Sequence, residues 1–513
     1  YEQLDREARA IAATLSKYNV VGQPVLLLEP PGLRFMATLF GCFYAGAIVV
    51  PNYPPAPRET SKTSIRFLRI VEDARPTVLV GSGKSLATAE RMAPQGIPCL
   101  DLDSIAHDGE GDWTEPELSD TDVALVQYTS GSTGSPKGVI LTHRNFLTNL
   151  KTIATATRVS EDSVGISWLP PYHDMGLTCI LLPVYAGFMV AHMSPQQFIF
   201  HPFSWLEAIT RYSGTISAAP NFAYDLCASR ISQEQRAKLN LASWEAALNG
   251  AESIRYETLN RFSNAFADCG FKSFAMQPCY GLAEATLWVS GKTAQTEPLI
   301  GRFRKMDLEQ GLVVPLGEEG HNPAQEDLQE RMLVSAGQIA DGFDLRIVNT
   351  QTGSTTPANQ VGEIWISGSS VCSGYWNNWQ ATQEAFADRV EDGVSKSFLK
   401  TGDLGFVHKN ELYLTGRLKD LIIVRGLNYY PQDIEQACEI AHPAVMSNGA
   451  CAFMIEQDDS EQIAVVCEIS RTQLREADLD DVMQRIQAAV GEELGLQVVS
   501  VVLLKQGTLP RTT

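Results

Sequence analysis

Short apolar runs alternate with longer helix-like stretches through about the first 300 residues of the chain. Residues 25–28, 48–50 and 78–80 are runs of Val, Leu and Ile, each the length of a short buried strand. Between the first two runs, residues 35–47 have the apolar spacing of a helix. Strands that alternate with helices in this way predict parallel α/β layers.

The pattern changes in the second half of the chain. A polar, Gln- and Glu-rich segment at 305–331 has little periodicity, and we interpret it either as an inserted loop or as part of an irregular lobe. From about residue 340 to 416 the apolar runs are short, and Gly, Asn and Asp turns separate them, which predicts a β-rich lobe.

Helix and strand patterns restart near residue 417. We expect helices at 431–441 and 480–494, and strands at 450–455, 463–469 and 498–504. The sequence therefore predicts an α/β protein. Its large N-terminal domain, at 1–416, contains α/β layers plus the β-rich lobe, and a small α+β C-terminal domain occupies 417–513.

The amino-acid composition limits the classes of molecule that the protein can bind. The 513 residues include 40 Lys and Arg against 60 Asp and Glu, a formal charge of −20. Nucleic-acid binding needs a basic face, so this charge argues against a nucleic-acid partner. The ten cysteines form no CxxC pair, which is typical of reduced core residues in a cytoplasmic protein.

The run at residues 175–191 contains no Asp, Glu, Lys, Arg or His and is a candidate for a membrane span. Its 17 residues include Pro183 and Gly187, and a spanning helix needs about 20 apolar residues. We interpret the run as a buried core segment and expect no integral membrane segment.

A dense group of Gly, Ser and Thr follows the apolar run at 123–126. Glycines let a backbone turn sharply and present N–H groups to an anion, hydroxyls add donors, and a lysine adds positive charge. This combination predicts a polyphosphate-binding loop, and its alternative is a flexible hairpin without a ligand. The residues are Thr129, Ser130, Gly131, Ser132, Thr133, Gly134 and Lys137.

This loop is not a Walker A loop. Lys137 precedes a glycine, and the apolar run at 139–141 follows in the place where that motif requires a helix. The pattern therefore predicts a strand–loop–strand arrangement.

Four further motifs follow in order. They are Asn249-Gly250-Ala251-Glu252, Tyr280-Gly281-Leu282-Ala283-Glu284, Thr401-Gly402-Asp403 and Gly416-Arg417-Leu418-Lys419-Asp420. With the glycine-rich loop, this series resembles the adenylate-forming superfamily, which includes acyl-CoA synthetases, peptide-synthetase adenylation domains and luciferases. The resemblance covers essentially the whole chain.

The resemblance implies a role for each motif. Residues 249–252 would lie against the adenine of ATP, and Tyr280 would offer it an aromatic face. Glu284 would be a ligand of Mg²⁺, as a hard carboxylate oxygen suits that ion. Asp403 would accept hydrogen bonds from the ribose hydroxyls, and Arg417 would bridge ribose and phosphate.

The alternatives are plain structural roles: a solvated helix residue for Glu284, a turn residue for Asp403 and a surface ion pair for Arg417. The resemblance also makes Lys419 the hinge about which a mobile C-terminal domain rotates between two half-reactions.

The run Trp168-Leu169-Pro170-Pro171-Tyr172-His173-Asp174-Met175-Gly176 resembles one branch of the superfamily, the fatty acyl-AMP ligases. His173 would lie near the acyl carboxylate and the α-phosphate; its alternative is a structural histidine. This branch carries an insertion near 305–331 that restrains the C-terminal domain and disfavours CoA.

The resemblance thus implies ATP-dependent activation of a medium- or long-chain fatty acid to acyl-adenylate, with ATP and Mg²⁺ as cofactors. The acyl group would pass to an acyl carrier protein, as in the loading step of polyketide or lipopeptide biosynthesis. The alternatives are a fatty acyl-CoA synthetase, an amino-acid or aryl-acid adenylation domain, and a nucleotide-binding module without turnover.

The chain closes on Leu509-Pro510-Arg511-Thr512-Thr513, the beginning of the superfamily's last motif, which ends in a catalytic lysine. We expect a truncated C-terminal domain, cut from a longer protein, and weakened adenylation until the lysine is restored.

Overall fold

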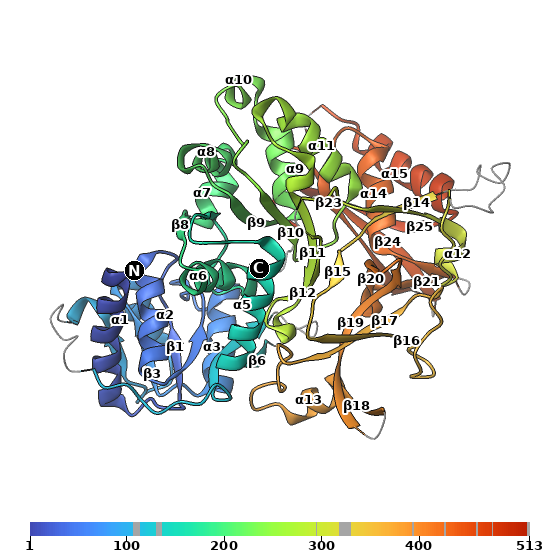
Figure 1. Cartoon of the computed structure of the whole chain (residues 1–513). Helices are drawn as coiled ribbons and strands as arrows, with labels where there is room; N and C mark the ends of the chain where they lie inside the picture. Colours follow the sequence, from blue (N-terminus) through green and yellow to red (C-terminus); the bar gives the residue numbers. More distant parts are fainter. Residues whose placement is uncertain are drawn as a thin grey trace. The chain divides into compact units, whose positions relative to one another are not determined.

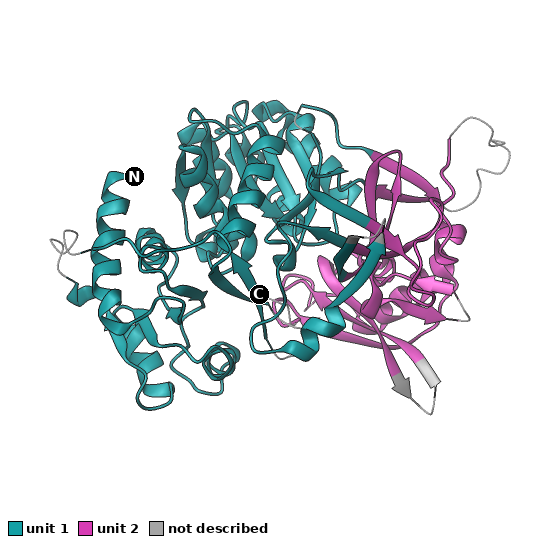
Figure 2. Ribbon diagram, turned by 60° about the horizontal axis from the view of Figure 1, so that its bottom comes forward, with its two compact units in different colours: residues 1–299, 334–345, 366–400 teal, residues 300–333, 346–365, 401–513 magenta. Residues whose placement is uncertain are grey.

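The chain forms two compact units, coloured separately in Figure 2. The first unit comprises residues 1–299, 334–345 and 366–400, and the second comprises 300–333, 346–365 and 401–513. The computed structural model describes residues 1–105, 113–129, 136–293, 295–317, 330–391, 394–424, 427–457, 460–474 and 476–509.

The first unit begins with a six-stranded sheet in the order β4-β3-β1-β2-β5-β6. All its neighbouring strands are parallel except the last pair, β5 and β6, which form an antiparallel hairpin. The buried strands read as continuous apolar runs because both faces of a parallel sheet are covered. The strands are β1 (Pro24–Leu27), β2 (Ile48–Pro51), β3 (Val78–Gly81), β4 (Cys99–Asp101), β5 (Val123–Thr129) and β6 (Lys137–Thr142).

Four helices accompany this sheet (Figure 1). They are α1 (Glu2–Leu15), α2 (Leu33–Tyr44), α3 (Lys62–Ala74) and α4 (Gly83–Met92). α1 and α2 are joined by a hydrogen bond from the Tyr44 hydroxyl to Asp5 Oδ1, 2.9 Å long. Ser61 caps α3, since its Oγ accepts a hydrogen bond from the Ser64 N–H at 3.1 Å.

A seven-stranded sheet follows in the order β15-β12-β11-β10-β9-β7-β8. Strands β8, β7, β9, β10 and β11 run parallel to one another. β12 pairs antiparallel with β11, and β15 pairs antiparallel with β12 at the edge of the sheet. The strands are β7 (Val164–Ser167), β8 (Met189–His192), β9 (Ile216–Pro220), β10 (Ala246–Gly250), β11 (Met276–Gly281), β12 (Trp288–Gly291) and β15 (Gln338–Ile339). The helices are α5 (His143–Thr157), α6 (Asp174–Ala186), α7 (Pro195–Phe200), α8 (Phe203–Tyr212), α9 (Asn221–Arg230), α10 (Gln233–Arg236) and α11 (Tyr256–Phe266).

Shorter β-elements complete the middle of the chain. In the first unit, β18 (Phe386–Glu391) follows α13 (Trp379–Ala385) and pairs with the first half of β19 (Val394–His408). In the second unit, the last half of β19 pairs with β20 (Glu411–Arg417). The other elements are β13 (Ile300–Arg304), α12 (Lys305–Glu309), β14 (Glu330–Val334), β16 (Phe343–Val348), β17 (Gly362–Gly368), β21 (Ile422–Val424) and β22 (Leu427–Tyr429).

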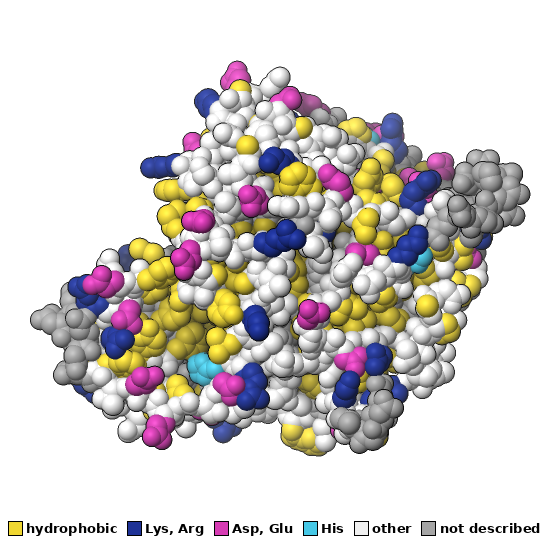
Figure 3. Space-filling view, viewed as in Figure 1, with side chains coloured by type: hydrophobic (Ala, Val, Ile, Leu, Met, Phe, Trp, Pro, Cys, Tyr) yellow, Lys and Arg dark blue, Asp and Glu magenta, His cyan; other side chains and the backbone are white. Residues whose placement is uncertain are grey.

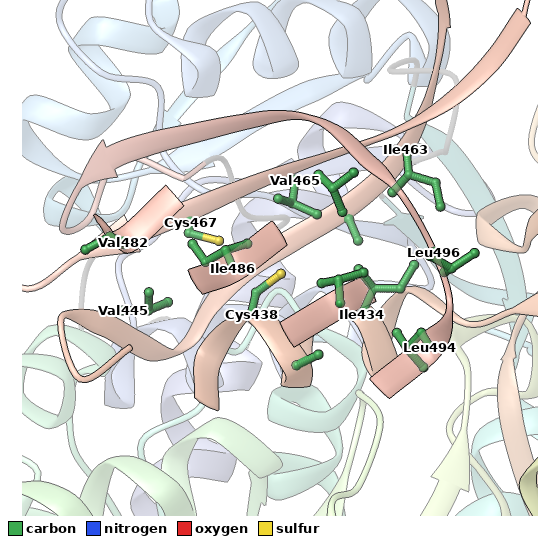
Figure 4. Close-up of a cluster of buried hydrophobic side chains, with 14 of the residues drawn as sticks. Ile434, Cys438, Val445, Ile463, Val465, Cys467, Val482, Ile486, Leu494 and Leu496 are labelled. Atoms are coloured by element: carbon green, nitrogen blue, oxygen red, sulfur yellow. The ribbon is translucent and has the colours of Figure 1, made fainter. Parts of the chain in front are cut away.

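The C-terminal residues build their own apolar core. α14 (Pro431–Ala441) and α15 (Leu479–Leu494) pack against a sheet of β23 (Val445–Gln457), β24 (Ser460–Ile469) and β25 (Val498–Lys505). Figure 4 shows Ile434 and Cys438 of α14, Val465 of β24 and Ile486 of α15 gathered in this core. All four side chains are fully buried.

The predicted α/β class is confirmed, and so are the five elements expected after residue 417. The run at 175–191 forms most of α6 and the start of β8, and the left-handed Gly187 ends the helix. The polar segment at 305–331 begins with α12 and ends in β14, and residues 318–329 lie outside the described residues. The domain boundary at 416/417 stays a prediction.

Three chemical features of the whole chain bear on function. No helix in the described ranges combines the length and the apolar character that a membrane span requires. All ten cysteines, each of them described, are free thiols, and six are buried. On the face that Figure 3 shows, basic side chains are interspersed with acidic ones.

Candidate functional site

The predicted polyphosphate loop connects the two strands of the β5–β6 hairpin. Thr129, the last residue of β5, pairs with Lys137, the first residue of β6, and its Oγ1 donates to the Lys137 carbonyl at 3.4 Å. This arrangement confirms the strand–loop–strand prediction and distinguishes the site from a Walker A loop. Ser130, Gly131, Ser132, Thr133 and Gly134 lie outside the described residues, so their role as phosphate ligands stays a prediction.

The end of β5 is tied to its surroundings on both sides. The Tyr128 carbonyl accepts a 2.8 Å hydrogen bond from Arg66 Nη2, and the Tyr128 hydroxyl donates to Asp73 at 2.5 Å. Burial raises the pKa of both Asp73 and Tyr128, as expected for polar groups removed from water. On the preceding residue, Gln127 Nε2 donates to the Tyr172 carbonyl at 2.6 Å. The hairpin is therefore held against the turn that carries His173.

His173 stands at the N-cap of α6, with its side chain about half exposed. Its Nδ1 lies 3.1 Å from Asp174 Oδ1, and the same oxygen accepts the Met175 N–H at 2.7 Å. Gly176 is required here, since a Cβ would stand 1.9 Å from the Pro170 carbonyl oxygen. The turn thus presents an imidazole with an adjacent carboxylate at the start of a helix, next to the β5–β6 hairpin.

Two of the predicted motifs lie at the carboxyl ends of neighbouring parallel strands, β10 and β11. Asn249 and Gly250 end β10 and are buried, and Ala251 continues in a left-handed conformation with φ of 67°. Glu252 accepts a hydrogen bond from the Phe222 N–H. Ligands of open α/β sheets bind at this end of the strands, so the position suits the adenine contact that the resemblance implies.

The motif on β11 continues from Tyr280, which is 8% exposed, through Gly281 and Leu282 into a turn. Gly281 permits a close approach, because a Cβ would stand 1.8 Å from the Leu287 carbonyl oxygen. The Leu282 N–H donates to that same carbonyl at 2.9 Å.

Glu284 lies in this turn, in the short 3-10 helix Ala283–Ala285. Asn149 of α5 braces the turn, since its Nδ2 donates to the carbonyls of Ala285 and Trp288 at 3.3 and 2.9 Å. Glu284 Oε1 accepts a 2.8 Å hydrogen bond from the Tyr375 hydroxyl. Its carboxylate is therefore an oriented oxygen donor rather than the solvated helix residue that the sequence left open.

Asp403, Arg417 and Lys419 belong to the second unit. Asp403 pairs with Arg417 across β19 and β20, and Asp403 Oδ1 lies 3.2 Å from Arg417 Nε. The Arg417 side chain is 58% exposed and keeps donors on the solvent side, while the Asp403 side chain is only 11% exposed. Lys419 is exposed in the 3-10 helix Leu418–Asp420.

A buried glutamate that the sequence did not single out holds the Asp403 turn. Glu363 of β17 accepts the Gly402 N–H at 3.0 Å through Oε1 and the Trp365 indole N–H at 2.7 Å through Oε2. Thr401 Oγ1 donates to the Ile364 carbonyl at 2.7 Å and accepts the Asp403 N–H at 3.1 Å. These bonds fix the backbone of the turn that carries Asp403, and Arg417 Nε contacts its carboxylate at 3.2 Å.

The structure thus brings one group of predicted residues together in the first unit, at the hairpin, the His173 turn and the Glu284 turn. It brings Asp403 and Arg417 together in the second. The residues that sequence reasoning missed are Gln127, Asn149, Glu363 and Tyr375, which hold these groups. Each acts across a sequence separation of 39 to 139 residues, so no local pattern marks it.

A metal ion could use Glu284 as its protein ligand. In the described part of the chain, no group of three or more His, Cys, Asp and Glu side chains is arranged to hold a metal. One carboxylate is nevertheless the donor set that Mg²⁺ takes when it arrives with a nucleotide, because phosphate oxygens and water fill the other positions. The residues therefore fit Mg²⁺ as a nucleotide-bound ion.

Comparison with known proteins adds the family. Residues 1–376 match the family described as AMP-binding enzyme, and residues 419–513 match the one described as Disco-interacting protein 2-like, AMP domain. The chain is 39% identical over 520 residues to the medium-chain-fatty-acid–[acyl-carrier-protein] ligase JamA of Moorena producens, covering 100% of this chain and 87% of that protein.

Two further proteins are similar to this chain over its whole length. The chain is 32% identical to the long-chain-fatty-acid–AMP ligase FadD32 of Mycolicibacterium smegmatis, covering 100% of this chain and 86% of that one. The crystal structure of a Legionella pneumophila fatty acyl-adenylate ligase with acyl adenylate and pyrophosphate superposes with a TM-score of 0.77. The two sequences are 39% identical, and the match covers 100% of this chain and 88% of the Legionella chain.

Proposed function

The chain belongs to the family of AMP-binding enzymes, and we propose that it activates a medium- or long-chain fatty acid with ATP and transfers the acyl group to an acyl carrier protein. The observation that carries the proposal is the hydrogen bond from Gln127 to the Tyr172 carbonyl, which joins the phosphate hairpin to the His173 turn. A reaction between a carboxylate and a nucleotide phosphate needs these two parts side by side. Similarity to fatty acid ligases over the full chain supports the substrate class.

In the first half-reaction, a carboxylate oxygen of the fatty acid attacks the α-phosphorus of ATP. A phosphorus–oxygen bond forms to the acid, the bond to the pyrophosphate oxygen breaks, and acyl-adenylate and pyrophosphate result. His173 would stand near the carboxylate and the α-phosphate, and Lys137 would neutralise phosphate charge. When bound, Mg²⁺ would supply further positive charge at the phosphates, held by Glu284.

Nucleotide recognition would be divided among the other predicted residues. Asn249, Gly250, Ala251 and Glu252 would lie along the adenine with Tyr280, Gly281 and Leu282. Asp403 would accept from the ribose hydroxyls and Arg417 would reach ribose and phosphate. Glu363 and Thr401 hold the backbone of the Asp403 turn, and Arg417 contacts the carboxylate; this supports the role, because a side chain on a fixed turn loses less entropy on binding.

In the second half-reaction, the phosphopantetheine sulfur of the carrier protein attacks the acyl carbon. A thioester bond forms, AMP leaves and the thiol proton is lost. We propose the carrier protein rather than CoA as acceptor because the segment at 305–331 contacts the C-terminal residues within the second unit. Arg331 Nη2 lies 3.2 Å from Asp433 Oδ1, and Lys305 Nζ donates to the Glu493 carbonyl at 3.3 Å.

Free thiols throughout the chain support a reducing, cytoplasmic location. A fatty acyl-CoA synthetase is the second candidate, since the fold and the first half-reaction are common to both.

The test mixes the protein with Mg-ATP and dodecanoate and identifies the products by mass spectrometry. With CoA, we expect dodecanoyl-adenylate to persist; with holo-acyl carrier protein, we expect it to be consumed as the protein thioester forms. Rapid formation of dodecanoyl-CoA would replace the proposal with the synthetase, and no pyrophosphate release would exclude both.

A further inference from the structure

Tyr375 is placed beside the phosphate hairpin by its backbone. It bridges to Val139 of β6, and the hydrogen bonds from Ile140 N–H to Gly374 O at 3.1 Å and from Trp376 N–H to Gly138 O at 2.7 Å flank the bridge. Its own N–H donates to Thr382 Oγ1 at 2.9 Å. The residue has little freedom to move relative to β6.

Its side chain contacts two residues of opposite charge. The hydroxyl donates to Glu284 Oε1 at 2.8 Å, and Lys137 Nζ lies 5.1 Å from the centroid of the ring. The first contact is a charge-assisted hydrogen bond, and the second is within the range of a cation–π interaction. Only 9% of the tyrosine is exposed, and its partners Lys137 and Glu284 are half-buried, so both contacts are partly shielded from water.

Glu284 is held at a second point of the same segment. The Cys372 N–H donates to the Glu284 carbonyl at 2.7 Å. Residues 372–375 therefore fix the backbone of Glu284 through Cys372 and its carboxylate through Tyr375. A carboxylate has two oxygens and about four lone-pair sites, so the bond at Oε1 orients the group while other lone pairs serve a metal.

We propose that Tyr375 is a positioning residue for the metal-bound nucleotide: it orients Glu284 toward Mg²⁺ and keeps Lys137 on its ring rather than on the glutamate. The proposal rests on the proposed function, because it assigns Mg-ATP to this site. Hydrogen-bonded partners of metal-binding carboxylates typically contribute about 10- to 100-fold to metal affinity. Tyr375 would thus control the part of ATP binding that depends on Mg²⁺.

The test measures ATP binding by calorimetry, once with Mg²⁺ and once with EDTA, so that the readout does not depend on turnover. Tyr375→Phe keeps the ring and removes the hydroxyl. We expect the ratio of the two affinities to fall by about tenfold, with ATP affinity in EDTA unchanged. Tyr375→Leu also removes the ring and should weaken binding in EDTA as well.

Tyr44→Phe is the matched control. The Tyr44 hydroxyl also donates to a carboxylate, Asp5 Oδ1, at 2.9 Å, but it joins α1 to α2. This variant should bind ATP like the wild type under both conditions, and thermal unfolding should show whether each variant folds. If folded Tyr375→Phe protein has the same ratio of ATP affinities with Mg²⁺ and with EDTA as the wild type, the inference about Tyr375 is overturned and the proposed function is not. A wild-type protein that binds no ATP would overturn the proposed function.

Discussion

At the scale of single residues, His192 links burial to pH. It ends β8, and its Nε2 is buried without a hydrogen-bond partner among the described residues. Burial lowers the pKa of His192 to about 4, against a value near 6.5 in an unfolded chain. Below pH 6.5 the unfolded state therefore binds a proton at His192, whereas the folded state keeps this side chain neutral. The contribution of His192 to the free energy of unfolding is complete above pH 6.5 and is lost as the pH falls toward 4.

We expect this loss to reach about 2 kcal/mol at pH 5 relative to pH 7. Urea unfolding at the two pH values should show it in the wild type, and His192→Gln should reduce the difference by that amount, because glutamine does not titrate. An identical pH dependence in both proteins would contradict the assignment.

The sequence suggested a role for a residue only where a local motif contains it. Glu284 and Asp403 stand in short motifs with a family meaning, so the sequence singled them out, and their roles stay predictions. Tyr375 and Glu363 hold the Glu284 and Asp403 turns, but their partners are 91 and 39 residues away. Hydrogen bonds across such separations depend on which strands become neighbours, and local patterns in a single sequence do not reveal that order.

At the scale of elements, the His173 turn depends on one glycine. Gly176 lies in the first turn of α6, and a Cβ there would stand 1.9 Å from the Pro170 carbonyl oxygen. Gly176→Ala must therefore shift the turn, and overpacking of this kind costs about 1–3 kcal/mol. We expect pyrophosphate release to fall by at least about tenfold, since the His173 turn moves with it.

Gly491→Ala provides the comparison in the same assay. Gly491 lies inside α15, where an added Cβ would have only the Leu496 carbonyl oxygen near it, at 3.8 Å. Alanine is the better helix former by roughly 1 kcal/mol, so this variant should be as stable as the wild type or more so, with full activity. Equal activity of the two alanine variants would show that the turn tolerates displacement.

A second element-scale prediction concerns the end of the segment at 305–331. Arg331 is 11% exposed; it pairs with Asp433, donates to the Thr415 carbonyl at 3.3 Å and lies 4.2 Å over the Tyr430 ring. Arg331→Ala removes all three contacts with residues 415–433. If these contacts restrain the C-terminal residues, the variant should convert more dodecanoyl-adenylate to dodecanoyl-CoA than the wild type.

Arg302→Ala serves as the control, because Arg302 of β13 pairs with Glu330 of the same segment. This pair lies at the surface, and exposed pairs contribute at most about 1 kcal/mol. Its CoA product should match that of the wild type. An Arg331→Ala protein that is folded and makes no additional dodecanoyl-CoA would remove the structural support for carrier-protein preference.

At the scale of the whole molecule, periodicity predicted the α/β class and the five elements that follow residue 417. The helices of the C-terminal residues were predictable because their apolar positions face one core, with Ile434, Cys438, Ile486 and Val490 fully buried. The division into two units, in contrast, was not predictable from the sequence pattern. The second unit collects residues from three separate parts of the chain, and a boundary read along the sequence has no means of representing that.

The last prediction concerns the two half-reactions. The resemblance makes Lys419 a hinge, and the structure leaves it exposed in a three-residue 3-10 helix that follows β20. Proline fixes φ near −65°, whereas a hinge residue must change its dihedral angles. Lys419→Pro should therefore keep pyrophosphate release within about threefold of the wild type and slow thioester formation on the carrier protein by at least about tenfold. Lys419→Ala removes the charge but leaves φ free, so both rates should survive. Equal slowing of both half-reactions by proline would indicate local damage rather than a blocked rotation.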